Sequence, residues 1–291
     1  MNTWAFRAMG TSIRILTDDT CAPRTLRTAT ALIRRTFERE ELRFSRFRAE
    51  SELSRVNAAS GRSIALTPPF GAVMRLALDA ASSTGGSFDP TVLNAMEAIG
   101  YDRDFDEVLA GARGVLRPAV PCGRWREVTL EDGVLRVPPG VGIDLGGIAK
   151  GWTADLAATR ALNAGLPWVL VNAGGDLRIV GDAPAIDVAI EDPEDRAAEI
   201  GRLSIREGGL ATSSSRSRSW GPGLHHVLDP RTGAPAETDL LQVTVMAPTC
   251  AEAEVRATVA LLTGSAATEQ PAVAVANDGR VLVGVPIEEA A

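Results

Sequence analysis

One glycine-rich stretch, GIDLGGIAKGWTAD at residues 142–155, places an acid and a base beside a predicted helix start. An apolar segment ends at Asp144, two glycines follow, and an alanine-rich helix is predicted to begin near Lys150. Glycines before a helix N-terminus expose backbone N–H groups and the positive end of the helix dipole, which suits a phosphate or pyrophosphate. Asp144 could bind a sugar hydroxyl, a ring N–H or a metal-bound water.

Lys150 is the only lysine in the chain, beside 29 arginines. A surface lysine tolerates replacement by arginine, whereas a confined phosphate site need not, so the count favours a specific role. The spacing matches neither the phosphate-binding P-loop nor the dinucleotide-binding glycine turn. The alternative interpretation is a tight turn followed by a surface lysine.

The two histidines of the chain, His225 and His226, are adjacent in LHHVLDPRTGAP at residues 224–235. In an extended segment their side chains point to opposite sides, so at most one serves a given pocket. Such a histidine could act as a general base near neutral pH. The alternative is a structural pair beside the turn that Asp229-Pro230-Arg231-Thr232-Gly233 predicts.

A predicted helix at residues 250–262 carries Glu254 and Thr258, four positions apart on one face. A carboxylate and a hydroxyl so placed could hold Mg²⁺ together with phosphate oxygens, or could simply form a helix surface. Two loops, GGSFDPTV at 85–92 and VNAGGDL at 171–177, each place an acid beside glycines. Both could also be plain turns.

Both helices and strands are predicted around these residues. The patterns predict one strand over 3–16, helices over 24–43, 68–83 and about 150–164, and a strand over 141–145. Residues 44–61 are expected to be a polar connecting segment. Asp-Gly turns predict hairpins around Asp132 and Asp278. Because hairpins dominate and no regular strand–helix–strand period appears, we expect an α+β fold with mostly antiparallel sheets and packed helices, in a single domain over 1–291 or two intertwined subdomains.

Composition limits the partners. The formal net charge of −7 and the absence of a Lys/Arg block argue against nucleic acid and against anionic membrane surfaces. Three cysteines without a C-x-x-C pair indicate neither a disulfide framework nor a zinc cluster. No segment resembles a signal peptide or a membrane span, so we expect a soluble cytoplasmic protein.

Taken together, the motifs resemble the ApbE family of flavin transferases, the FAD:protein FMN transferases. The matching stretches follow the family's order over roughly 250 residues: Met-Gly-Thr at Met9, FSRFRAESELSRVN from Phe44, GGSFDPTV, IDLGGIAKGWTAD, VNAGGDL, ATSSS, HHVLDPRTG and VTVMAPTCAEAEVRAT. The resemblance implies a T-fold-like α+β architecture and Mg²⁺-assisted transfer of FMN from FAD, with Mn²⁺ as an alternative cation. The acceptor would be a Thr or Ser hydroxyl of a target protein, and AMP would be released.

The resemblance also implies roles by position. His226 matches the catalytic histidine. The positions that match the flavin site are Met9, Phe47, Ser87, Phe88, Asp89, Asp144, Lys150 and Leu228. The positions that match the metal site are Gly147, through its carbonyl, Glu254 and Thr258.

Two positions depart from the family pattern. Glu254 stands where the family usually has Asp, and its extra methylene matters because Mg²⁺ demands tight octahedral geometry. Phe47 stands where Tyr is frequent, which keeps stacking but removes a phenol hydrogen bond. Two other functions therefore stay open: an FAD pyrophosphatase, in which water replaces the hydroxyl, and a non-catalytic FAD-binding protein.

Overall fold

The computed structural model of the chain describes residues 1–59, 61–111, 116–195, 197–267, 273–284 and 288–289. The chain divides into two compact units built from interleaved segments. The first contains Met1–Arg39, Lys150–Ser217 and Thr238–Ala291, and the second contains Glu40–Ala149 and Arg218–Glu237. No described helix combines the length and apolar character that a membrane span requires.

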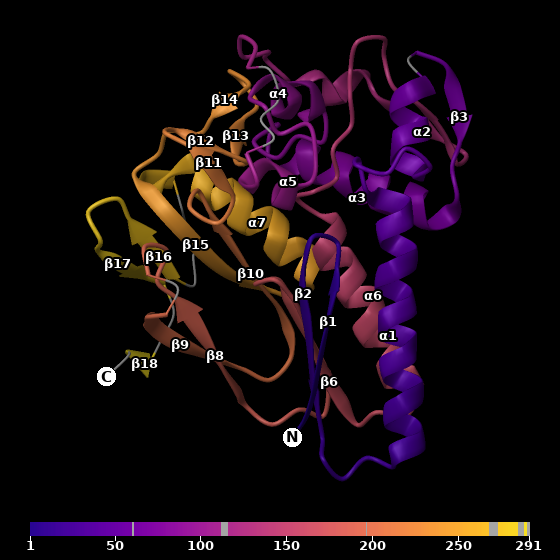
Figure 1. Ribbon diagram of the computed structural model, residues 1–291, viewed down its shortest axis with the longest axis vertical. Helices are drawn as coiled ribbons and strands as arrows, with labels where there is room; N and C mark the ends of the chain where they lie inside the picture. Colours follow the sequence, from indigo (N-terminus) through magenta and orange to yellow (C-terminus); the bar gives the residue numbers. More distant parts are fainter. Residues whose placement is uncertain (60, 112–115, 196, 268–272, 285–287, 290–291) are drawn as a thin grey trace. The chain divides into compact units, whose positions relative to one another are not determined.

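The first unit is organised around an eight-stranded sheet in which every neighbouring pair is antiparallel (Figure 1). In spatial order its strands are β1 (Asn2–Ala8), β2 (Thr11–Thr17), β6 (Trp168–Ala173), β7 (Leu177–Gly181), β10 (Gly208–Ser214), β15 (Leu240–Ala247), β16 (Val273–Ala276) and β17 (Val281–Val283). A second sheet joins β8 (Ile186–Glu191), β9 (Glu199–Ile205) and β18 (Glu288–Glu289).

Strand β6 shows why this sheet is covered on both faces. Successive side chains of a strand point to opposite faces. Val169 and Val171 pack in one core cluster with residues of α1 (Pro23–Phe44) and α6 (Ala149–Asn163). Trp168 and Leu170 pack in another cluster with residues of β8 and β9. The near-continuous burial of β6 follows from these two apolar layers.

The second unit consists of short elements. Its helices are α2 (Glu52–Ala59), α3 (Pro68–Ser83), α4 (Leu93–Ala98), α5 (Phe105–Leu109) and the 3₁₀ turn η1 (Arg124–Glu127). A three-stranded sheet joins β3 (Ser63–Ala65), β5 (Val134–Arg136) and β4 (Thr129–Glu131), and two ribbons pair β11 (Ser219–Gly221) with β12 (Leu224–His225) and β13 (Leu228–Asp229) with β14 (Ala234–Pro235). One of its apolar clusters centres on Tyr101 and Trp220, whose ring centroids are 5.3 Å apart.

The fold class expected from the sequence, α+β with antiparallel sheets and packed helices, is confirmed. The helix over 68–83 and the Asp-Gly hairpins around Asp132 and Asp278 are also confirmed. Helix α7 (Cys250–Thr263) ends one residue beyond the predicted range.

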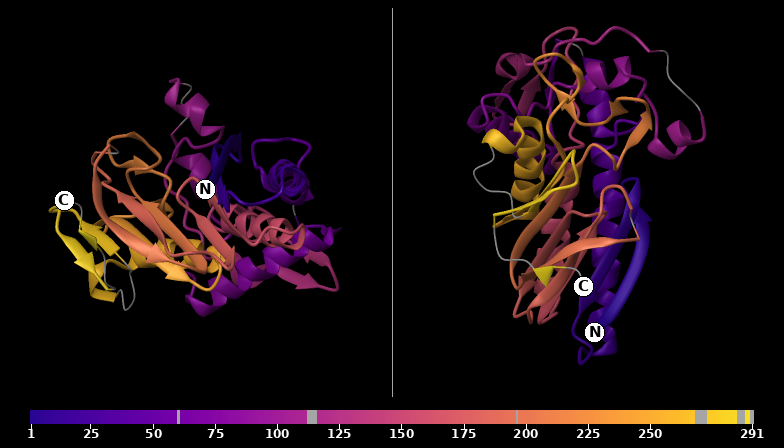
Figure 2. Two further views of the ribbon diagram at one scale, coloured as in Figure 1. Left: turned by 90° about the horizontal axis from the view of Figure 1, so that it is seen from below. Right: turned by 90° about the vertical axis from the view of Figure 1, so that its left-hand side faces the viewer.

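Three local predictions are wrong. Residues 3–16 form a hairpin rather than one strand, because Met9 and Gly10 adopt positive φ of 50° and 68° and turn the chain. Figure 2 shows this hairpin in indigo at the edge of the sheet. The polar segment after Phe44 contains helix α2. Residues 141–145 are buried but form no strand, because Asn57 accepts from the Ile143 N–H and donates to the Ile143 carbonyl, taking the place of a strand partner.

Candidate functional site

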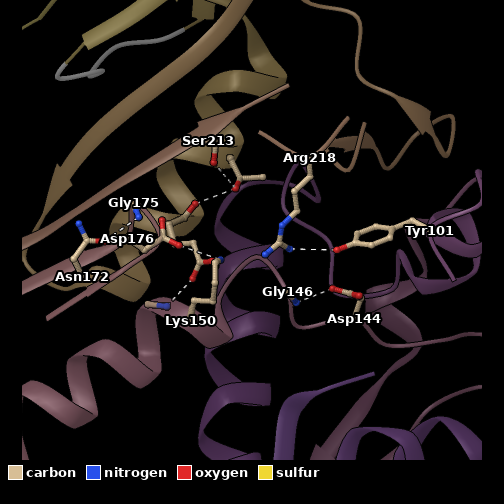
Figure 3. A network of polar contacts seen from close by, with 12 residues as sticks. Tyr101, Asp144, Gly146, Lys150, Asn172, Gly175, Asp176, Ser213 and Arg218 are labelled. Carbon is tan, nitrogen blue, oxygen red and sulfur yellow. Dashed lines mark hydrogen bonds and ion pairs between the residues drawn. The ribbon is translucent and has the colours of Figure 1, made fainter. Parts of the chain in front are cut away.

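The site residues predicted from the sequence fall into both units. In the first unit, Lys150 lies in the first turn of α6 and its ammonium contacts two carboxylates (Figure 3). Lys150 Nζ is 3.0 Å from Asp176 Oδ2 and forms an ion pair with Glu254 Oε1. The Asp176 and Glu254 side chains are only 6% and 5% exposed, against 19% for Lys150. We call these three residues the lysine cluster.

Asp176 reaches this cluster from the tight turn between β6 and β7. Gly174 and Gly175 both adopt positive φ, of 72° and 105°, which glycine tolerates without steric cost. The Asn172 side chain accepts from the Gly175 N–H at 2.9 Å, and the Ala173 N–H donates to the Asp176 carbonyl at 2.7 Å. The VNAGGDL motif therefore aims an acid at the start of α6.

Glu254 is held by more than Lys150. The Gly151 N–H of α6 donates to Glu254 Oε2 at 2.9 Å, so each carboxylate oxygen has a partner. Thr258 Oγ1 donates to the Glu254 carbonyl at 3.0 Å and lies 3.1 Å from Ser213 Oγ. Burial raises the pKa of the Glu254 carboxyl above its usual range, and the neighbouring Lys150 ammonium opposes that rise.

Helices α6 and α7 cap each other in a reciprocal arrangement. Asp155 of α6 accepts from the Cys250 and Ala251 N–H groups, at 2.9 and 3.0 Å, at the start of α7. Glu254 of α7 in turn accepts from the Gly151 N–H at the start of α6. The first N–H groups of a helix have no partner within the helix, and a carboxylate there also meets the favourable end of the dipole. The contacts fix where Glu254 lies relative to Lys150.

In the second unit, Asp144 pairs with an arginine that the sequence analysis did not single out. Arg46 Nε lies 2.9 Å from Asp144 Oδ2, and Asp144 Oδ1 accepts from the Gly146 N–H at 2.6 Å. The Arg46 guanidinium lies 4.3 Å from the ring centroid of Phe47 and 4.4 Å from that of Tyr101. Figure 3 shows Asp144 with Gly146, and Tyr101 with Arg218, whose Nη1 is 3.4 Å from the phenol oxygen.

The GGSFDPTV loop is also ordered by its own acid. Asp89 is buried, and its Oδ1 accepts from the N–H and hydroxyl of Thr91 at 2.7 and 2.6 Å. Asp89 Oδ2 accepts from the Gly123 N–H at 2.5 Å. Phe88 is buried next to Gly147, since a Cβ added at Gly147 would lie 3.2 Å from the Phe88 ring. Ser87 is partly exposed in the same loop.

The remaining predicted residues occupy turns and ribbons. His225 ends β12 and His226 follows it, both half-buried, and the His226 N–H donates to the Arg218 carbonyl at 3.2 Å. Leu228 is buried in the cluster around Tyr101 and Trp220. Met9 forms the β1–β2 turn in the first unit, partly buried.

The structure thus brings Lys150, Glu254 and Thr258 together, and separately joins Phe47 to Asp144 through Arg46, and Phe88 to Gly147. Sequence reasoning missed the contributions of Asp155, Asp176 and Arg46. For Asp176 the available signal was its place in VNAGGDL, where an acid directly follows two glycines. Nothing in the sequence pattern signals that Asp155 caps α7 or that Arg46 pairs with Asp144, since each pair is separated by 95 or more residues.

The first-unit residues predicted to bind Mg²⁺ do not form an open metal site. Oxygen ligands of the right type are present in Glu254, Asp176 and Thr258. Both Glu254 oxygens are nevertheless engaged, by an ammonium and an N–H, and the Thr258 hydroxyl bonds a carbonyl and another hydroxyl. Across the described residues, no group of three or more His, Cys, Asp or Glu side chains is arranged to hold a metal ion.

Solved structures that resemble this chain include ApbE proteins and flavin transferases. The ApbE protein from Thermotoga maritima aligns with a TM-score of 0.81 and 26% identity, covering 97% of this chain and 96% of that one. The flavin transferase ApbE from Vibrio cholerae aligns with a TM-score of 0.76 and 25% identity, covering 97% and 95%. A family model described as the ApbE family matches residues 9–279. The chain therefore belongs to the ApbE family.

Curated relatives carry a consistent description. A protein of Rhodobacter capsulatus called FAD:protein FMN transferase is 30% identical over 226 residues, which cover 74% of this chain and 43% of that protein. One of Treponema pallidum with the same name is 29% identical over 251 residues, which cover 78% of this chain and 69% of that protein. The alignment to the Rhodobacter protein thus spans less than half of that protein's length.

Proposed function

We propose that the protein is an FAD:protein FMN transferase, which moves FMN from FAD onto a Thr or Ser hydroxyl of a target protein and releases AMP. The observation that carries this proposal is the ApbE family match over residues 9–279, in a chain that keeps His226, Asp144 and Lys150 at the motif positions. The names of the curated relatives support the same activity.

The proposed step exchanges one phosphorus–oxygen bond for another. The acceptor oxygen attacks the phosphorus on the riboflavin side of the FAD pyrophosphate, and the bond to the bridging oxygen breaks. The bridging oxygen leaves with AMP, and an imidazole nitrogen of His226 takes the hydroxyl proton. General-base catalysis of this kind contributes about 10²–10⁴-fold.

Other residues of the chain would bind and orient FAD. Lys150 would reach phosphate oxygens at the start of α6 by exchanging one of its contacts with Asp176 and Glu254 for the phosphate. The exposed Phe47 ring would stack on a planar heterocycle. The full flavin-binding set stays as proposed from the resemblance: Met9, Phe47, Ser87, Phe88, Asp89, Asp144, Lys150 and Leu228.

The proposal also includes the cation, the cellular location and the domain organisation. Mg²⁺, or Mn²⁺, held by Gly147, Glu254 and Thr258 stays a prediction from the resemblance. A cytoplasmic location and a Thr- or Ser-containing target motif are likewise proposals. We also propose that residues 1–291 form a single flavin transferase domain.

The experiment that tests the function compares the two adjacent histidines. Purified protein, FAD, Mg²⁺ and a peptide carrying a flavinylation motif are incubated, and the peptide mass is measured. His226→Asn should lower FMN transfer by about 10²–10⁴-fold while FAD binding persists. His225→Asn is the matched control, because it changes the neighbouring imidazole and should transfer at a rate close to wild type.

The product pattern separates the alternative functions. A peptide that gains one FMN supports the transferase. FMN and AMP without any gain in peptide mass would instead identify an FAD pyrophosphatase. FAD that is bound but unchanged, with Mg²⁺ or with Mn²⁺, would identify a binding protein and overturn both enzymatic readings.

A further inference from the structure

The lysine cluster contains its own cation. Two carboxylates, Asp176 and Glu254, are almost completely withdrawn from solvent, and both contact the ammonium of Lys150. A buried carboxylate is costly unless a cation or hydrogen bonds compensate it. One ammonium contacts both acids, and the Gly151 N–H adds a hydrogen bond to Glu254.

The remaining contacts leave little capacity for a second cation. Glu254 Oε2 accepts from the Gly151 N–H, and the Thr258 hydroxyl is bonded to the Glu254 carbonyl and to Ser213. Mg²⁺ requires oxygen ligands at about 2.0–2.1 Å in near-octahedral geometry. A divalent ion on Glu254 would also lie close to the ammonium, and like charges repel strongly where water is excluded.

The side-chain lengths match this arrangement. An ammonium is a compact charge with three rotatable donors, so it can contact two carboxylates that arrive from different elements. Glu254 is long enough to hold the Lys150 ammonium with one oxygen and the Gly151 N–H with the other. The ammonium and the Gly151 N–H thus engage both Glu254 oxygens without a metal.

We propose that Lys150 is the resident cation of the Asp176–Glu254 pair, and that a divalent cation binds these carboxylates only by displacing Lys150. The inference rests on the proposed function for the identity of the competing ion, Mg²⁺ or Mn²⁺. It makes cation binding at this site an exchange between the side chain and the metal.

The first test measures metal binding without FAD or peptide, so failure of the transferase assay does not affect it. Mn²⁺ is titrated into purified protein, and free Mn²⁺ is followed by electron paramagnetic resonance. Lys150→Met should raise the Mn²⁺ affinity by about tenfold or more, because it removes the competing charge. Adding Glu254→Gln to that variant should abolish the gain.

Arg178→Met is the matched control, because it removes one positive charge from the same unit. Arg178 Nε pairs with Asp155 at 3.4 Å, whereas the lysine cluster consists of Lys150, Asp176 and Glu254. Its Mn²⁺ affinity should stay near that of wild type. Equal affinity in wild type and Lys150→Met, weaker binding in Lys150→Met, or an equal gain in Arg178→Met would overturn the proposal.

A second measurement takes its main result from the wild-type protein, with Glu254→Gln as the comparison. Because Lys150 is the only lysine, isotope-labelled lysine gives one side-chain signal in NMR spectra. Titration with Mg²⁺ should shift the Lys150 signal as the ion takes its carboxylates. A signal that stays unchanged up to Mg²⁺ saturation, or that shifts equally in Glu254→Gln, would contradict the exchange.

Discussion

Helix α6 lies in close contact with the backbone at the start of α7 at Gly151. Replacing this glycine with alanine tests the reciprocal capping of the two helices. A Cβ at Gly151 would lie 2.7 Å from the Cys250 carbonyl oxygen and 2.8 Å from both Cα and N of Ala251. All three are backbone atoms, so no side chain can rotate away, and the helices must separate. Separation would stretch the Gly151–Glu254 and Asp155–Cys250 hydrogen bonds.

The magnitude follows from opposing terms. Overpacking costs about 1–3 kcal/mol, and weakening hydrogen bonds to a charged group costs about 1.5–3 kcal/mol each. Alanine returns about 1 kcal/mol of helix propensity. We therefore expect Gly151→Ala to lower the free energy of unfolding by about 3 kcal/mol or more.

A second helical glycine supplies the matched control. Gly71 lies in α3, and a Cβ built there meets nothing within 4 Å. Gly71→Ala should therefore raise the free energy of unfolding by about 0.4–1 kcal/mol. Urea unfolding followed by far-ultraviolet circular dichroism measures both variants. If Gly151→Ala were as stable as Gly71→Ala, the close approach of the two helices would be refuted.

Three further outcomes are expected. Asp155→Asn should lower the free energy of unfolding by about 1–2 kcal/mol in the same urea assay, because an amide accepts fewer of the α7 N–H bonds; an unchanged value would contradict the cap. Lys150→Arg should weaken FAD binding or transfer while circular dichroism stays unchanged, because a planar guanidinium does not replace an ammonium between two carboxylates; wild-type affinity and rate would argue against a specific role. Burial raises the pKa of the Cys122 thiol to about 12 from its ordinary 9.0. Between these pH values the folded state keeps a proton that the unfolded state releases, so stability should fall as pH rises, and less so in Cys122→Ala; equal pH profiles in urea unfolding would contradict this.

Much of the fold could be predicted because its signals are local. The helix over 68–83 begins with two prolines at its first positions, and both Asp-Gly hairpins carry their turn residues at the correct spacing. The Met9-Gly10 turn could not be predicted in the same way. Methionine rarely adopts positive φ, so the alternating pattern on either side of Met9 predicts one continuous strand.

Residues 141–145 illustrate a different limit. They are apolar and buried, which is what a central strand requires, yet their backbone partners come from elsewhere in the chain. The Ile143 backbone bonds to the side chain of Asn57, and the Asp144 N–H donates to the Pro90 carbonyl. A strand pattern predicts burial and extension, but it does not reveal whether a neighbouring strand is present.

In the candidate site, too, the sequence indicates which residues are important but not which residues they contact. The sequence identifies Lys150 by its uniqueness and Glu254 by its departure from the family's usual Asp. It cannot show that they are partners, since 104 residues separate them and the ion pair depends on how α6 and α7 pack. The ion pair explains the residue type at both positions. The ammonium suits two converging carboxylates, and the additional methylene of Glu254 lets one carboxylate reach both the ammonium and the Gly151 N–H.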